Sequence, residues 1–166
     1  MLSVALVSNA DPARLETTLR ALVPATLDGQ VCDVWVFCGE PAPIAALCDA
    51  MGAETVSPSD AQNALQRCRG EWLLVLEEGA WPRGDWVAVL AAHAASGGGA
   101  ARFRTQEPVV PFWRRLFGRA GDPLRAGFLI PVDQARAALR NGSLATLPVG
   151  RAVRTLRADL EPASES

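Results

Sequence analysis

The sequence predicts an α/β fold of Rossmann-like type, in which a mostly parallel central sheet has helices on both faces. Residues 2–7, 31–37 and 71–76 are short runs in which apolar side chains are nearly continuous instead of alternating. Such runs are typical of strands that are covered on both faces, as in parallel sheets. The segments between these runs carry apolar residues at helical spacing. Strands that alternate with helices predict right-handed βαβ units, here in the strand order 3-2-1-4.

Three helices are expected in this first half, at residues 11–25, 43–52 and 59–70. Asp11 can cap the first of them, because its side chain can accept hydrogen bonds from the amides of the first turn. A glycine ends the second and third helices, as glycine commonly does just past a helix C-terminus. Between those two helices, residues 54–56 predict a short strand.

The second half continues the alternation less regularly. His93, the only histidine, is expected to be a solvated side chain near a helix C-terminus. No internal repeat or linker divides the chain, so residues 1–160 are expected to form one domain and residues 161–166 a disordered tail. The predicted elements are a helix at 85–95, a strand at 100–104, a strand at 127–131, a helix at 133–140 and a strand at 151–160.

Composition excludes several classes of protein. The chain has 166 residues, 49% hydrophobic residues and a net charge of −2. These values are typical of a globular domain and give no sign of a nucleic-acid-binding protein, whose surface is basic. The four cysteines lack paired CxxC spacing, so we interpret them as reduced core residues and not as zinc ligands. Neither a signal peptide nor an apolar run of about 20 residues is found, and we expect a cytoplasmic protein.

Polar side chains follow two strands that the predicted order places side by side. Ser8 and Asn9 come directly after the first strand, and Glu77, Glu78 and Gly79 follow the fourth. Ligands of open α/β sheets bind outside the carboxyl ends of the strands, where the strand order reverses. The sequence therefore predicts a ligand-binding crevice between these two groups of residues.

The chain contains, in order, LSVALVSNADPARLETTLRALVPA, DVWVFCGEP and AQNALQRCRGEWLLVLEEGAWPRGDW. In order and spacing these stretches resemble the nucleotide-binding half of family 2 glycosyltransferases, which have the GT-A fold. The resemblance covers residues 2–104. A weaker similarity, to a stretch that many bacterial members carry after the sheet, continues through FWRRLFGRAGDPLRAGFLIPVDQARAAL.

The resemblance implies a metal site that this chain has altered. In the family, a DxD motif at the end of the fourth strand holds Mg²⁺ or Mn²⁺ against the diphosphate of a sugar nucleotide. Glu77, Glu78 and Gly79 stand there instead, and Gly79 offers no side-chain oxygen. Of the Arg-Asn pair that the family carries before this strand, only Asn63 remains. The acidic turn that contacts the base is replaced by residues 38–40.

The predicted function is binding of a nucleoside diphosphate sugar, with transferase activity weakened or lost. The resemblance assigns the nucleotide and diphosphate to Ser8, Asn9, Asn63, Glu77 and Glu78. Glu77 and Glu78 would hold Mg²⁺ or Mn²⁺ if the transferase is active, since Mg²⁺ can be bound by one or two carboxylates together with substrate phosphates. If it is inactive, no cofactor is expected. The alternative is a non-catalytic interaction protein that keeps the GT-A scaffold.

A second candidate surface lies in the stretch PFWRRLFGR. At helical spacing Phe112, Trp113 and Phe117 fall on one side, and Arg114 and Arg115 lie on another. A helix of this kind can lie in a membrane interface, here at the inner face of the membrane, or contact a protein partner. The competing interpretation is a helix that packs its aromatic side chains on the sheet and leaves its arginines in water.

Overall fold

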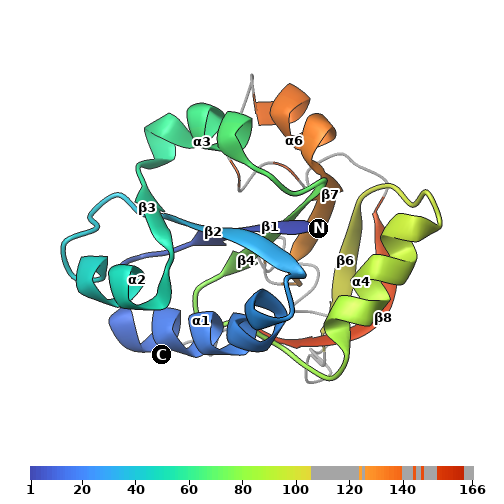
Figure 1. Ribbon diagram of the computed structural model, residues 1–166, viewed down its shortest axis with the longest axis horizontal. Helices are drawn as coiled ribbons and strands as arrows, with labels where there is room; N and C mark the ends of the chain where they lie inside the picture. Colours follow the sequence, from blue (N-terminus) through green and yellow to red (C-terminus); the bar gives the residue numbers. More distant parts are fainter. Residues whose placement is uncertain (106–123, 125, 140–143, 145–146, 148–152, 163–166) are drawn as a thin grey trace, which may run out of the picture.

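The computed structural model describes residues 1–105, 124, 126–139, 144, 147 and 153–162. Strands and helices alternate through these ranges, as the sequence predicts (Figure 1). In chain order the elements are β1 (Leu2–Val7), α1 (Pro12–Leu27), β2 (Val31–Phe37), α2 (Ala45–Met51), β3 (Glu54–Val56), η1 (Pro58–Asp60), α3 (Ala61–Arg67), β4 (Trp72–Glu77), β5 (Trp81–Pro82), α4 (Trp86–Ala95), β6 (Ala101–Thr105), β7 (Phe128–Pro131), α6 (Val132–Leu139) and β8 (Arg154–Glu161).

The described strands form one sheet in the order β3-β2-β1-β4-β7-β6-β8-β5. The first four confirm the predicted order 3-2-1-4, and their pairings are parallel. Val7 pairs with Phe37 on one side and with Glu77 on the other, so the three strands end level with one another. The carboxyl ends of β1, β2 and β4 therefore meet at one edge of the sheet.

The second half of the sheet mixes directions. β7 runs antiparallel to β4 and β6, whereas β6 and β8 are parallel. β5, which the sequence did not predict, pairs antiparallel with the end of β8. β8 includes Glu161, one residue past the predicted domain boundary, and residues 163–166 of the expected tail lie outside the described residues.

Two apolar clusters cover the two faces of the sheet and explain the continuous apolarity of its strands. Leu74 and Leu76 of β4 belong to the cluster with α1, α2 and α4. Leu73 and Val75, which point the other way, belong to the cluster with α3 and α6. Each buried leucine contributes about 1.5–3 kcal/mol relative to an exposed one. The layers are visible in Figure 1, where α3 and α6 lie above the sheet and α1 and α2 below it.

Helix α1 starts as predicted. The Asp11 side chain accepts hydrogen bonds from the backbone amides of Ala13 at 3.0 Å and Arg14 at 3.2 Å. These are two of the four amides that have no partner within a helix. The helix continues past the predicted end at residue 25 and stops at Leu27, with Pro24 inside it.

Replacing Asp11 by alanine is expected to lower the free energy of unfolding by about 1 kcal/mol, because two amides lose their acceptor. The midpoint of thermal unfolding, followed by circular dichroism, should fall by about 2–4 °C in a chain of this size. Asp11→Ser keeps an oxygen in reach of the same amides and should lose less than half as much. Equal losses in both variants would show that the cap is not the source of the effect.

The prediction of a solvated His93 is wrong. The side chain is buried, and its Nε2 lies 2.8 Å from the carbonyl oxygen of Gly99. Its ring meets the edge of Trp72 with the ring centres 5.8 Å apart. The chain folds back after α4, so Gly98 passes so close to the imidazole that no side chain would fit there. This return of the chain, and not the position at a helix end, determines the burial.

The four cysteines are free thiols, in agreement with their interpretation as reduced residues. Burial is the main cause that raises the pKa of Cys68 to about 11. The thiol therefore stays protonated near neutral pH, and since thiolates are the reactive form, this residue is a chemically inert part of the core. In the ranges that the structure describes, none of the helices is both long and apolar enough to cross a membrane.

Candidate functional site at the carboxyl edge of the sheet

The ends of β1 and β4 bring Ser8 and Glu78 side by side, although 70 positions separate them in the chain. The amide of Ser8 donates to the carbonyl oxygen of Phe37, and the amide of Glu78 donates to that of Val7, both at 3.0 Å. These bonds extend the sheet by one residue on each strand. The crevice residues predicted after the first and fourth strands thus lie at one edge.

The Glu78 side chain points into the protein and closes this edge. Its Oε2 accepts a hydrogen bond of 2.6 Å from the Ser8 hydroxyl and a longer one of 3.4 Å from the amide of Asp11. Only 2% of Glu78 and 7% of Ser8 is exposed to solvent. Hydrogen bonds to a carboxylate are shorter and stronger than neutral ones, so this contact is a major link between the β1–α1 loop and the turn after β4.

The same contact supports a strained loop. Ala10 has a φ of 67°, the only described residue other than glycine with a positive φ. A non-glycine residue in this region costs about 1–3 kcal/mol and persists only where its surroundings fix it. The amide of Ala10 donates to the Ser8 hydroxyl oxygen at 3.0 Å. Ser8 therefore joins the strained residue on one side to Glu78 on the other.

Arg14 ties the first turn of α1 to the turn after β4. Its Nη2 donates to the carbonyl oxygen of Glu78 at 3.4 Å, and the amide of Gly79 donates to the Arg14 carbonyl oxygen at 3.0 Å. Among the described residues, Arg14 Nε and Glu78 Oε1 are both buried without a hydrogen-bond partner. Unmade hydrogen bonds of buried groups cost about 1–3 kcal/mol each. The edge thus retains one donor and one acceptor with capacity for another polar group.

These residues do not fit a divalent cation. A DxD-type site needs carboxylate oxygens that face the ligand, and one Glu78 oxygen is already bonded to Ser8 inside the protein. Gly79 has no side-chain oxygen, and Glu77 is only half-buried at the end of β4. In the part of the chain that the structure describes, no three His, Cys, Asp or Glu side chains gather as a metal ion would require.

The other predicted nucleotide ligands lie apart from this contact. Asn9 is exposed directly after Ser8. Asn63 is exposed in the first turn of α3, where its Nδ2 donates to Asp60 Oδ1 at 2.5 Å. Cys38, which follows β2 at the same edge, is buried, whereas Gly39 and Glu40 are exposed. The predicted membrane or partner surface lies outside the described residues; it consists of Phe112, Trp113, Arg114, Arg115 and Phe117.

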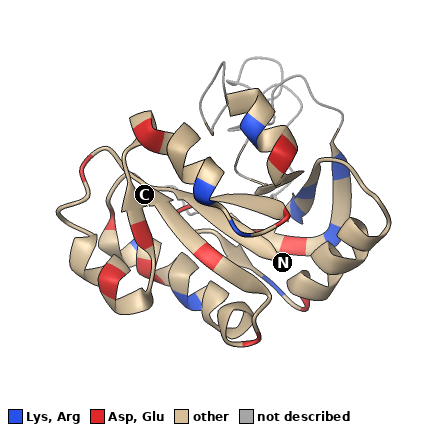
Figure 2. Cartoon of the chain, turned by 45° about the horizontal axis from the view of Figure 1, so that its top comes forward, with Lys and Arg blue, Asp and Glu red and all other residues tan. Residues whose placement is uncertain are grey.

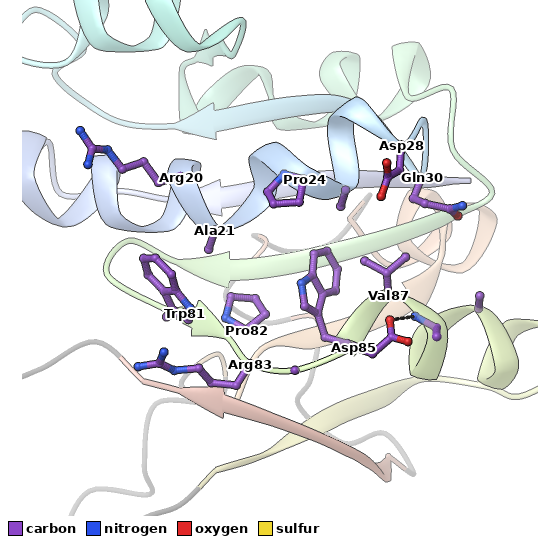
Figure 3. Close-up of a pocket in the computed structure, with 15 residues that line it drawn as sticks. Arg20, Ala21, Pro24, Asp28, Gln30, Trp81, Pro82, Arg83, Asp85 and Val87 are labelled. Atoms are coloured by element: carbon purple, nitrogen blue, oxygen red, sulfur yellow. Dashed lines mark hydrogen bonds between the residues drawn. The ribbon is translucent and has the colours of Figure 1, made fainter.

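A groove of about 580 Å³ lies between α1 and the chain from β5 into α4 (Figure 3). Pro24 of α1 and Asp28, the residue just after this helix, line one side, and Trp81 and Pro82 line the other. Its volume is in the range of small-molecule sites, and its lining mixes aromatic with charged side chains. Because it follows the second half of α1, it lies away from Ser8 and Glu78.

Trp81 connects this groove to the candidate edge. It also lines a smaller hollow of about 330 Å³ together with Arg14 and Gly79. The Arg83 guanidinium lies over its ring, 5.4 Å from the ring centre, and pairs with Glu161. Neither Arg14 nor Arg83 was predicted from the sequence as a site residue. No sequence pattern marks Arg83, because its carboxylate partner Glu161 comes from the distant strand β8.

The fold is similar to that of glucosyl-3-phosphoglycerate synthase from Mycobacterium tuberculosis. The complex of that enzyme with Mn²⁺, UDP and glucosyl-3-phosphoglycerate gives a TM-score of 0.59 at 17% identity, over 81% of this chain and 57% of that one. Its complex with Mg²⁺ and UDP gives a TM-score of 0.66 at 16% identity, over 100% of this chain and 72% of the synthase chain. A structure described as a mycobacterial protein gives a TM-score of 0.62 at 16% identity, over 100% of this chain and 68% of that one.

No protein-family model and no curated protein matches the sequence. This chain spans 57% of the length of the first of these structures. At such identities the likeness shows the fold alone. The chain has the α/β fold of GT-A glycosyltransferases, with a mostly parallel sheet between helices, as the sequence predicts.

Proposed function

We propose that this chain is a glycosyltransferase-like domain that binds a nucleoside diphosphate sugar at the edge formed by Ser8, Asn9, Glu77 and Glu78, with Asn63 beside the nucleotide. The observation that carries the proposal is the buried contact between Ser8 and Glu78 at the point where the strand order reverses. Sheets of this type bind nucleotides at that point. The synthase with a similar fold was crystallised with UDP and with UDP-glucose, which supports the same ligand class here.

In this proposal the transferase activity is weakened or lost. A diphosphate leaving group develops negative charge, which a divalent ion with open coordination positions normally neutralises. If Mg²⁺ or Mn²⁺ binds, Glu77 and Glu78 would hold it, with one oxygen of Glu78 already bonded to Ser8. Among the described residues after β7, Asp133 is the first carboxylate that could act as a general base, and its 93% exposed side chain pairs with Arg136 in α6.

Isothermal titration calorimetry with UDP, GDP and their sugars tests the proposal. We expect at least one of them to bind, with a dissociation constant that changes less than about threefold between EDTA and Mn²⁺, a difference below 1 kcal/mol. Ser8→Ala should weaken binding, because the strained loop loses its link to Glu78. Ser57→Ala, an exposed serine after β3, is the matched control and should bind as the wild type does. The absence of heat with every ligand would reject the proposal.

The alternative function is that of a non-catalytic interaction protein on the same scaffold. The inward position of Glu78 favours it, because the carboxylate at the crevice serves the fold. A titration without heat, from a protein with an unchanged circular dichroism spectrum, would support this alternative.

A further inference from the structure

Charge is divided unevenly along the chain. Residues 101–161, which end with β8, contain eleven arginines and five carboxylates, whereas residues 1–100 contain five arginines and twelve carboxylates. Lysine is absent from the sequence. The net charge of −2 therefore hides a basic segment and an acidic one. Such asymmetry within a single chain indicates a surface that faces an anionic partner.

The basic segment includes two neighbouring strands, β6 and β8, whose arginines share one face. Arg102 and Arg104 are exposed and alternate with the buried Ala101 and Phe103. They pair with Thr155 and Asp159 of β8, so those side chains point to the same side of the sheet. Arg157 lies between them on β8, exposed, next to the buried Leu156 and Ala158. We call Arg102, Arg104 and Arg157 the arginine surface.

Carboxylates neutralise little of this surface. Arg104 pairs with Asp159 at 2.7 Å. Arg102 donates only to the Thr155 hydroxyl, at 3.4 Å, and for Arg157 no ion pair is formed within the described ranges. In Figure 2 basic segments gather toward the β6–β8 end of the molecule, while acidic segments are concentrated around the opposite end of the sheet. The fold therefore preserves the asymmetry of the sequence.

We propose that the arginine surface docks on an anionic lipid bilayer. Two adjacent strands present their outward side chains in one plane, which suits a flat and negatively charged surface. A nucleic-acid partner is disfavoured, because the chain has a pI of about 5.4 whereas nucleic-acid-binding domains are typically basic throughout. The acidic half of the chain then faces away from the bilayer.

Co-sedimentation of the full chain with vesicles tests this inference. We expect binding to phosphatidylcholine vesicles that contain a third of phosphatidylserine, little binding to pure phosphatidylcholine, and loss of binding in 0.5 M NaCl, because salt screens exposed charges. Each arginine near an anionic surface contributes about a fivefold factor to the partition coefficient. The triple variant Arg102→Gln, Arg104→Gln, Arg157→Gln should therefore bind about 100-fold more weakly.

A matched control separates the arginine surface from total charge. Arg20→Gln, Arg67→Gln, Arg69→Gln removes three exposed arginines that lie away from β6 and β8, and this variant should bind vesicles about as well as the wild type. Wild-type binding by the first triple variant, or equal binding to neutral vesicles, would overturn the proposal. So would binding to an oligonucleotide or a polyglutamate peptide without binding to anionic vesicles.

Discussion

Replacing Gly70 by alanine is expected to destabilise the protein by more than about 3 kcal/mol, at or beyond the upper end of the usual cost of overpacking. A Cβ at this position would lie 2.4 Å from the Ser3 amide nitrogen and 2.7 Å from the Leu2 carbonyl carbon. Both atoms belong to the backbone of β1, the central strand of the parallel half of the sheet, and cannot move away without breaking its pairing. Gly70 also donates its amide to the Ser3 hydroxyl at 2.9 Å, a bond that the shift would disrupt.

Thermal and urea unfolding measure this effect. The midpoint of thermal unfolding should fall by at least about 6–12 °C, at about 2–4 °C for each kcal/mol in a chain of this size. Gly39→Ala is the matched control, since nothing lies within 4 Å of its added Cβ, and it should unfold within about 2 °C of the wild type. A Gly70→Ala protein that unfolds like this control would show that β1 and the start of β4 are not in contact.

The sequence predicts the parallel half of the fold well because the physical signals there are local. Leu73 to Leu76 alternate between two buried faces, and a strand covered on both sides has to be apolar at every position. The start of α1 follows the same logic, since Asp11 accepts backbone amides of the turn that it precedes. β5 was missed because two residues, one of them proline, carry no strand pattern.

The candidate site could be predicted only in part. Strand order brings the residues after β1 and β4 to one edge, and this follows from alternation and handedness. The sequence does not reveal which of two adjacent glutamates turns inward, because that depends on the turn after β4 and on the position of Ser8. Arg14 was missed for the same reason. Its bond to the Glu78 carbonyl oxygen joins residues 64 positions apart, and no local pattern marks it.

Replacing Glu78 by alanine is expected to cost about 2–4 kcal/mol, from a new cavity and from a buried Ser8 hydroxyl that loses its acceptor. The strain at Ala10 should then relax, so amide hydrogen exchange in the β1–α1 loop should speed up along with the loss of stability. Ser8→Ala removes the same hydrogen bond from its other end. In a double-mutant cycle of thermodynamic stability, the two substitutions should show a coupling energy above about 1 kcal/mol, as residues in direct contact do.

Glu78→Gln distinguishes a hydrogen-bonding role from a charge-bearing one. Its amide oxygen can still accept from Ser8, and its NH₂ group replaces Oε1, which has no partner among the described residues. We therefore expect a loss below about 1 kcal/mol, far less than for alanine. If Gln destabilises as much as Ala, or if Mn²⁺ raises the unfolding midpoint of the wild type but not of Glu78→Gln, then the charge of Glu78 matters. Either result would mean that this carboxylate still binds a cation and does not only hold the loop, and the case for a weakened transferase would lose its structural basis.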